Sequence, residues 1–371
     1  MQKYTFTLKP ITAVHIGTGD VISPLEYAIG KIEQKDILFT FYPEKLVSLL
    51  NSEELKTFNS LVEKNNIVGL RNFLSDKAKC KNYVQACINY IVWITDEFKK
   101  KYEQTKDDIN NALEIATTYK ANKRIIIPGS SIKGAIRTAV LNAIANQEQN
   151  KDYRVTEQDK RDDRSFQQRM LNYDDAKKDP FRAIYLSDVS FSPKENLIVS
   201  PMMLAHFNSE DNPVGINIYV EALKGVLLNS DISGIGEICI KNELLGQRIM
   251  ANNNNEFILK KQKYHDINIL SDYISIFYNN VFTDEYNKVQ EGKMNDSIKA
   301  IYDQLANYID RDMKKNNEIL IRIGRWSHVE AVTIENFRRP FNRRGSGKTR
   351  TLIQYNGGFY PMGWCAMKIN F

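Results

Sequence analysis

The sequence predicts an α+β fold built on antiparallel sheets, and three observations indicate this class. Strand-like segments such as "KYTFTL" at residues 3–8 alternate polar with apolar residues, as half-buried antiparallel strands do. Segments of helical periodicity are interleaved with them in both halves of the chain. The length of 371 residues suggests about two domains of ordinary size. We place these domains at residues 1–200 and 201–371.

The first half is expected to begin with three strands and to continue with a helical insertion. A glycine-rich turn, "HIGTGD" at 15–20, follows the first strand, and "EYAIGKI" at 26–32 and "KDILFTFY" at 35–42 predict two more strands. From Glu44 to about Lys101 the apolar residues recur at helical spacing, which predicts a helical insertion at about residues 44–120. The residues at this spacing include Leu46, Leu49, Leu50, Val84, Cys87, Ile88, Ile91 and Ile94.

Three further segments complete the first half. "KRIIIPG" at 123–129 predicts a strand that runs directly into a helix. Residues 145–182 mix charges of both signs, which predicts a surface loop or an exposed helix. "AIYLSDVSF" at 183–191 predicts the strand that closes the first domain.

The second half repeats the alternation of strands and helices. "INIYVEALKGVLLN" at 216–229 predicts a pair of strands, and residues 272–282 and 297–309 show helical patterns. "EILIRIGRW" at 318–326 predicts a strand before a basic glycine loop, and "MGWCAMKI" at 362–369 predicts the last strand.

The net charge of +6 is concentrated in one segment. Residues 322–350 hold eight basic and two acidic residues, while the rest of the chain is formally neutral. A concentrated basic stripe is typical of proteins that bind a polyanion.

The composition, 42% apolar and 26% charged, is that of a soluble globular protein. We expect an intracellular protein without a membrane span, because no apolar run is long enough for one. The four cysteines form no C-x-x-C pair and the four histidines lack ligand spacing, so neither a metal nor a cofactor is predicted.

The segment "IIIPGSSIKGAIRT" at 125–138 predicts an anion cradle. A strand that runs into a helix leaves backbone N–H groups at the helix start, where Ser130 or Ser131 can serve as the cap. Lys133 and Arg137 are four residues apart on a face beside an apolar stripe, and Gly134 lets a backbone approach between them. A core helix with two solvated cations explains these local features equally well.

"GSGKT" at 345–349 resembles a nucleotide-binding P-loop, but Asn342 occupies a position where that motif needs glycine. The following residues also indicate a strand or loop instead of the required helix. We therefore expect a loop that follows a nucleic-acid backbone, with Trp326, Phe337 and Phe341 either stacked on bases or buried. The loop residues expected to contact RNA are Arg343, Arg344, Gly345, Gly347, Lys348 and Arg350.

His15, in the glycine-rich turn, has the chemistry of a general base for an RNA 2′-hydroxyl. A second titratable group is not specified beside it, however. A hydrogen-bonded structural role or an RNA contact is therefore the favoured interpretation.

Four blocks in order resemble the RAMP superfamily of CRISPR proteins: "HIGTGDVISPLEY", "IPGSSIKGAIRTAVL", "RIGRWSHVE" and "PMGWCAMKI". Within it, the sequence is similar to the subunit that caps the far end of the type III-A effector, the Csm complex. The blocks span residues 13–369, whereas residues 44–123 and 145–182 carry no recognised motif.

This resemblance implies two ferredoxin-like (RRM-like) domains with helical insertions. It implies a non-catalytic, cytoplasmic subunit on the 3′ part of the crRNA, needed for complex assembly and crRNA maturation in antiviral defence. The implied partners are crRNA, the backbone RAMP subunit and the small helical subunit, with target RNA contacted indirectly. The residues implied at the RNA are His15, Gly17, Gly19, Ser130, Ser131, Lys133, Gly134, Arg137, Arg325 and the loop Gly345 to Arg350.

Three alternatives remain. Other RAMP proteins are metal-independent endoribonucleases that process CRISPR RNA, and His15 would then act in cleavage. A nucleotide hydrolase would use "GSGKT". A structural scaffold would dock its basic loop on an acidic protein.

Overall fold

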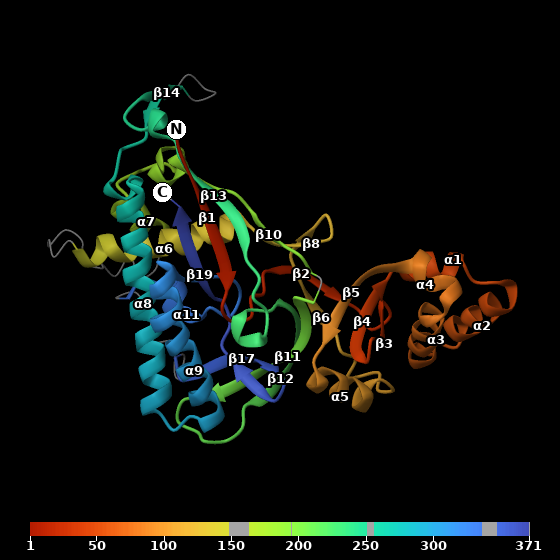
Figure 1. Ribbon diagram of the computed structural model, residues 1–371. Coiled ribbons are helices and arrows are strands. Elements are labelled where there is room, and N and C mark those ends of the chain that lie inside the picture. Colours follow the sequence, from red (N-terminus) through yellow and green to blue (C-terminus); the bar gives the residue numbers. More distant parts are fainter. Residues whose placement is uncertain (148–162, 194, 251–255, 336–346, 371) are drawn as a thin grey trace.

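The protein is described by a computed structural model that covers residues 1–147, 163–193, 195–250, 256–335 and 347–370. One of its two large sheets has five antiparallel strands in the order β16-β19-β1-β13-β9 (Figure 1). Their bounds are β1 Gln2–Pro10, β9 Ile184–Leu186, β13 Gly234–Ile240, β16 Ile319–Arg322 and β19 Trp364–Asn370.

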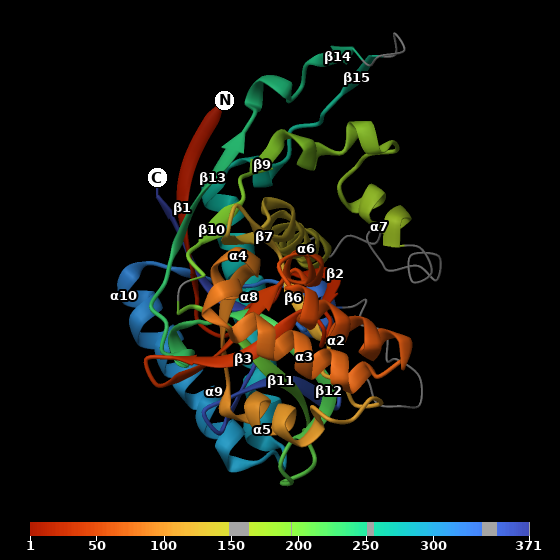
Figure 2. The ribbon, with the colours of Figure 1, turned by 90° about the vertical axis from the view of Figure 1, so that its right-hand side faces the viewer.

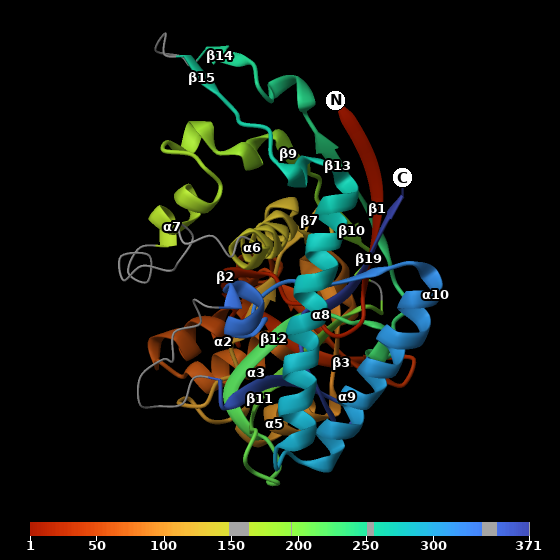
Figure 3. The ribbon, with the colours of Figure 1, turned by 90° about the vertical axis from the view of Figure 1, so that its left-hand side faces the viewer.

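Two helices lie on the same side of this sheet, α6 (Gly129–Gln147) and α8 (Ile267–Glu291) (Figure 3). The Tyr278 hydroxyl of α8 donates to the Ala135 carbonyl of α6 over 3.1 Å. Along the chain the elements follow as β1-α6-β9-β13-α8-β19, which is the order of a ferredoxin-like unit with large insertions. The expected α+β class is therefore confirmed.

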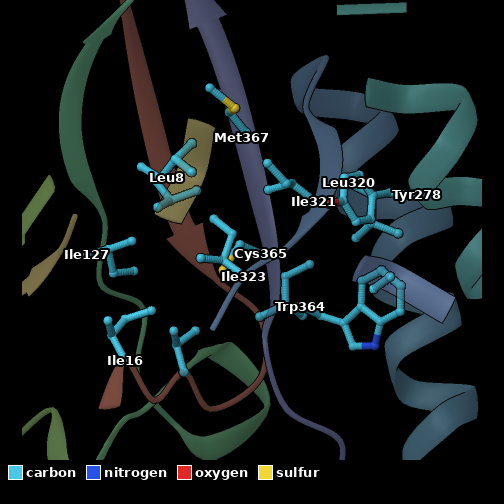
Figure 4. Close-up of a cluster of buried hydrophobic side chains, with 14 of the residues drawn as sticks. Leu8, Ile16, Ile127, Tyr278, Leu320, Ile321, Ile323, Trp364, Cys365 and Met367 are labelled. Atoms are coloured by element: carbon cyan, nitrogen blue, oxygen red, sulfur yellow. The ribbon is translucent and has the colours of Figure 1, made fainter. Parts of the chain in front are cut away.

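The main core lies between this sheet and these helices (Figure 4). Strand β1 alternates as its sequence predicts, because Phe6 and Leu8 are buried while Thr5 is exposed. Met367 of β19 lies beside Leu8, and Trp364 of the same strand packs on Phe282 of α8 within the same core. Burial of these large side chains is the main stabilising term for the unit.

The second large sheet is mixed, not purely antiparallel. Its nine strands run β2-β6-β12-β11-β5-β4-β3, with β17 paired to β11 and β18 paired to β17. The pairs β11–β5 and β12–β6 are parallel, since long crossovers separate these strands along the chain. The bounds are β2 Gly17–Ile22, β3 Tyr27–Ile32, β4 Lys35–Phe41, β5 Ile88–Ile94, β6 Ile115–Thr118, β11 Leu197–His206, β12 Val214–Leu223, β17 Thr349–Tyr355 and β18 Gly358–Tyr360.

The predicted helical insertion is interrupted by a strand. Residues 88–94, "INYIVWI", form β5 between β4 and β11, so the helical prediction is wrong for Ile88, Ile91 and Ile94. Short apolar runs fit either period, and the β-branched and aromatic residues here suit a sheet. The helices of this region are α1 Pro43–Ser48, α2 Ser52–Glu63, α3 Ile67–Lys79, α4 Lys81–Cys87 and α5 Asp96–Thr105. Figure 2 views α2, α3 and α4 in front of the rest of the molecule.

The remaining elements are short strands and helices. Strands β7 and β10 flank β8 in a three-stranded sheet, and β14 and β15 form a hairpin. Their bounds are β7 Lys120–Ala121, β8 Arg124–Ile127, β10 Val189–Phe191, β14 Arg248–Met250 and β15 Glu256–Ile258. The helices are α7 Asp163–Met170, α9 Asp296–Tyr308, α10 Lys314–Asn316 and α11 His328–Val332. A π-helical turn covers Ile309–Met313, and 3-10 turns cover Ala176–Lys178, Pro180–Ala183, Val226–Leu228, Asn242–Leu244 and Lys263–His265.

Both large sheets combine strands from either side of residue 200, and β11 itself spans that residue. Strand β1 pairs with β19, so the first and last strands of the chain lie side by side. The domain division at residue 200 stays a prediction.

Candidate RNA interface

Three segments that are distant in sequence form one groove of about 520 Å³, which we call the α6 groove. Gly17 and Gly19 of β2 line one part of it, and Ser131, Gly134 and Thr138 of α6 line another. Residues 322–327 complete the lining, including the predicted Arg325. The structure therefore brings together residues from three of the four blocks that the sequence singles out.

Gly134 opens the floor of the groove. A Cβ atom added there would have no other heavy atom within 4 Å, so packing does not require glycine at this position. Glycine inside a helix costs about 1 kcal/mol relative to alanine. This cost is explained if the space above Gly134 receives a ligand that approaches the helix backbone.

The segment 324–328 crosses the groove in a strained conformation. Gly324 has a φ of 96°, and Trp326 and His328 have φ values of 63° and 60°. Left-handed backbone costs a non-glycine residue roughly 1 kcal/mol or more and is concentrated at functional sites. A Cβ on Gly324 would lie 2.7 Å from the His15 carbonyl oxygen, so this position requires glycine for space as well.

Two arginines line the groove, one exposed and one buried. Arg325 is exposed, its backbone N–H donates to the His15 carbonyl over 3.0 Å, and its guanidinium lies 4.8 Å from the centre of the Trp326 ring. Arg322 is buried, and its Nε donates to the Met362 carbonyl over 2.9 Å.

The guanidinium of Arg322 has one nitrogen without a partner. Nη1 of Arg322 pairs with Glu285 at 2.5 Å, whereas its Nη2 is buried and has no hydrogen-bond partner among the described residues. A buried donor without a partner costs about 1–3 kcal/mol.

His15 lies behind the groove wall and is fully buried. Its Nδ1–H donates to the Glu221 carbonyl over 2.7 Å, and its ring packs 5.1 Å from that of Trp326. Burial lowers the pKa of His15 to about 4, so the ring is neutral near pH 7. Since a general base must reach the proton that it removes, this buried position favours a structural role.

Lys133 and Arg137 point to a different face of α6 and contact the protein itself. Lys133 Nζ donates to the Ile184 carbonyl over 2.6 Å, and burial lowers the pKa of its amine. Arg137 pairs with Asp179 at 2.8 Å and lies 5.0 Å from the centre of the Phe181 ring. These contacts give both cations structural partners, and their predicted contact with RNA gains no support from them.

A carboxylate accepts a hydrogen bond from the first backbone N–H group of α6. Asp188 Oδ1 accepts from the Gly129 N–H over 2.8 Å, while the N–H groups of Ser131 and Ile132 donate to the Pro128 carbonyl. An anion at this helix end is electrostatically favourable, and here the protein supplies it. Ser130 is exposed, and Ser131 lines the groove.

The C-terminal basic loop is described only in part. Arg343, Arg344 and Gly345 lie outside the described residues, as do Phe337 and Phe341. Gly347 and Lys348 are exposed, and the residues that follow form strand β17, so a P-loop helix is excluded.

Arg350 belongs to the buried core, because it is 1% exposed and paired with Glu330 at 3.0 Å and with Glu285 at 3.4 Å. A direct contact between its side chain and RNA therefore gains no support from this position.

Sequence reasoning missed Arg322, Thr138 and Asp188. Thr138 follows Gly134 by about one helical turn, so the sequence pattern already places the two residues on the same face of the helix. Arg322 belongs to the basic stretch 322–350 but sits in a predicted strand, and Asp188 had no signal because it is distant in sequence from the helix that it caps.

Within the described ranges there is no group of three or more His, Cys, Asp or Glu side chains placed to hold a metal ion. None of the helices in the described part of the chain is both long and apolar enough to cross a membrane.

Comparisons with known proteins identify one family and one fold. The model of the RAMP superfamily matches residues 7–333. A chain in the cryo-EM structure of a Csm–crRNA–target RNA ternary complex of a type III-A CRISPR–Cas system is 20% identical, with a TM-score of 0.64 and coverage of 98% of this chain and 100% of that chain. The crystal structure of T. onnurineus Csm5 is 19% identical, with a TM-score of 0.57 and coverage of 97% and 99%. No curated protein matches the chain.

Proposed function

Because this chain belongs to the RAMP superfamily, we propose that it is a crRNA-binding subunit of a type III-A CRISPR–Cas effector complex. Its relatives of the same fold include a chain from a Csm–crRNA–target RNA complex and a Csm5 protein, which supports this assignment. The finer role is a non-catalytic, cytoplasmic subunit at the 3′ part of the crRNA, needed for assembly and crRNA maturation. Its partners would be the backbone RAMP subunit and the small helical subunit, with target RNA contacted through the complex.

One observation carries the proposal. Residues from three superfamily blocks, represented by Gly17, Gly134 and Arg325, form a single groove in which no described lining residue is acidic. The exposed Arg325 lines this groove together with Ser131 and Thr138, beside a space that a helical glycine leaves open. Arginine and hydroxyl donors suit phosphate oxygens, so the groove would hold the RNA backbone and select little for base sequence.

The same groove supports the non-catalytic role over the endoribonuclease alternative. Its titratable lining residues are Tyr278, Arg322 and Arg325. The Tyr278 hydroxyl donates to Ala135, and arginine stays protonated, so none of the three is poised as a general base. His15 is buried behind the wall and does not line the groove.

The test fills the space above Gly134. Gly134→Glu places a carboxylate in the groove, and we expect single-stranded RNA affinity to fall by at least roughly 10-fold because of occlusion and like-charge repulsion. Gly134→Ala is the matched control: it meets no other atom, so RNA binding should stay within about two-fold while the protein gains up to about 1 kcal/mol of stability. Binding is measured by fluorescence anisotropy, and the free energy of unfolding by urea titration.

If Gly134→Glu folds normally and binds RNA as tightly as the parent protein, the α6 groove is not the RNA site. RNA cleavage by the parent protein would instead favour the endoribonuclease alternative.

A further inference from the structure

A second and larger groove, of about 750 Å³, lies between the segment that follows α7 and the strand β15. We call it the α7 groove. Four cations line it, and Asp174 is the only acidic side chain among its described lining residues. These cations are Arg169, Lys178, Arg248 and Lys260. The lining charge is therefore strongly positive, as at surfaces that bind polyanions.

The lysines of this groove are available for exchange with a ligand. Lys178 pairs with Asp174 at 2.8 Å, but the two side chains are 39% and 75% exposed. An exposed pair of this kind contributes only a few tenths of a kcal/mol, so a phosphate can replace the carboxylate at little cost. Lys260 is exposed, and its Nζ donates to the neutral Asn172 side chain over 2.8 Å.

Aromatic side chains stand among these cations. Phe257 and Tyr173 line the groove and are half-buried, and Ile258 beside them is 46% exposed. The guanidinium of Arg182 lies 5.8 Å from the centre of the Phe257 ring. A positive groove that also offers aromatic faces fits single-stranded RNA, whose phosphates pair with the cations while bases stack on the rings.

Helix α6 is the partition between the two grooves. Its residues Ser131, Gly134 and Thr138 line the α6 groove, while Arg137, on another face, donates to the Tyr173 hydroxyl over 3.1 Å. Figure 3 shows the β14–β15 hairpin above α6 and β2 below it. An α-helix with its side chains is about 10–12 Å thick. A few nucleotides of single-stranded RNA can therefore span the distance from one side of α6 to the other.

We propose that the α7 groove binds a second stretch of the phosphodiester backbone of the same single-stranded RNA that occupies the α6 groove. This inference rests on the proposed function. It gives Arg137 a defined task, because the Arg137–Tyr173 and Arg137–Asp179 bonds fix the α7 groove to the helix that carries the first site.

The experiment uses the full chain and two RNAs of unrelated sequence, about 6 and about 30 nucleotides long, near and above the roughly 4–16 nucleotides that one site covers. Lys178→Gln/Lys260→Gln removes two cations from the α7 groove. Lys56→Gln/Lys64→Gln removes two exposed cations at α2 as the matched charge control. Arg325→Gln reports on the α6 groove.

We expect the α7-groove variant to bind the long RNA roughly 10-fold more weakly at about 0.1 M salt, with a salt slope smaller by about 1.4. The short RNA and the α2 control should change by less than about two-fold. Arg325→Gln should weaken both RNAs.

Unchanged affinity and slope for the long RNA in Lys178→Gln/Lys260→Gln would overturn this inference, and the groove would then suit an acidic protein instead. The proposed function would survive that result as long as Arg325→Gln still weakens binding. If the parent protein binds neither RNA, the proposed function fails together with the inference.

Discussion

Single residues behind the α6 groove hold its arginines in place. Burial opposes ionisation of Glu285, but the nearby Arg322 and Arg350 outweigh it and lower the pKa of this carboxyl to about 2. Glu285 therefore stays charged and fixes Arg322, whose ring contact with Trp364 at 4.6 Å further restrains it. The buried Arg322 guanidinium is thus held in one position behind the groove.

The low pKa of the buried His15 leads us to predict that the folded protein loses stability in mild acid. Its pKa is about 4 in the folded protein against an ordinary value near 6.5, so the unfolded chain binds a proton more readily. Its contribution is therefore complete above about pH 6.5 and is lost as the pH falls toward 4, by about 2 kcal/mol at pH 5. We expect the free energy of unfolding to fall between pH 7.5 and pH 5 and to fall less steeply in His15→Gln, as measured by urea titration.

His328 provides a comparison for this prediction. Burial also lowers its pKa to about 4, so His328→Gln should flatten the same pH range independently. An unfolding free energy that stays constant from pH 7.5 to pH 5 would show that neither imidazole resists protonation in the folded state.

At the scale of elements, α6 presents three different faces. Ile132, Ile136 and Val140 are fully buried, as the predicted apolar stripe requires. Gly134 belongs to the groove face, and Arg137 joins the helix to the segment after α7. Contacts on different faces prevent α6 from rotating about its own axis, so each side chain belongs to only one of these surfaces.

Arg137 should be a stability residue of this element. Arg137→Ala removes the pair with Asp179 and the contact with Phe181, and we expect it to lower the free energy of unfolding by about 2 kcal/mol. Arg137→Lys should restore only part of this loss, because lysine lacks the planar fork that contacts Gln167, Tyr173 and Asp179 together.

A direct phosphate contact by Arg137 predicts the reverse pattern. Stability would stay within about 0.5 kcal/mol of the parent, and the salt slope of RNA binding to the folded variant would fall by about 0.7. Urea titration and anisotropy on the same preparation separate the two outcomes.

At the scale of the whole molecule, the helices α1 to α4 extend from the tip of a hairpin. Strands β4 and β5 pair from Ile37↔Trp93 to Phe41↔Ile88, so the chain leaves and re-enters this sheet at adjacent positions. The helices pack on these strands through a buried cluster separate from the main core, in which Phe39 of β4 meets Leu74 of α3. Figure 1 shows them well away from α6 and α8.

Replacement of residues 42–87 by Asn-Gly should therefore leave the rest of the molecule folded. This dipeptide favours the two-residue turn that joins paired antiparallel strands. We expect a cooperative unfolding transition and RNA affinity within about two-fold of the parent, since no residue of the α6 groove is removed. Circular dichroism and anisotropy provide the measurements, and loss of cooperative folding would show that the insertion is part of the main core.

The sequence by itself determined the fold class, the strand β1, the strand β8 that runs directly into α6 and the three blocks that meet in the α6 groove. Residues close together in the sequence specify each of these features, through a local period, a glycine turn or a recognisable block.

Only the tertiary structure decided which side chains of those blocks face the groove. Lys133 and Arg137 have the chemistry of phosphate ligands, but Ile184 and Asp179 occupy them, whereas the buried Nη2 of Arg322 has no hydrogen-bond partner in the described part of the chain. Residues 88–94 likewise became a strand because β4 and β11 lie on either side of them. A local pattern fixes the period of a segment, but the partners on each face come from residues far away in sequence, and these contacts decide what each side chain does.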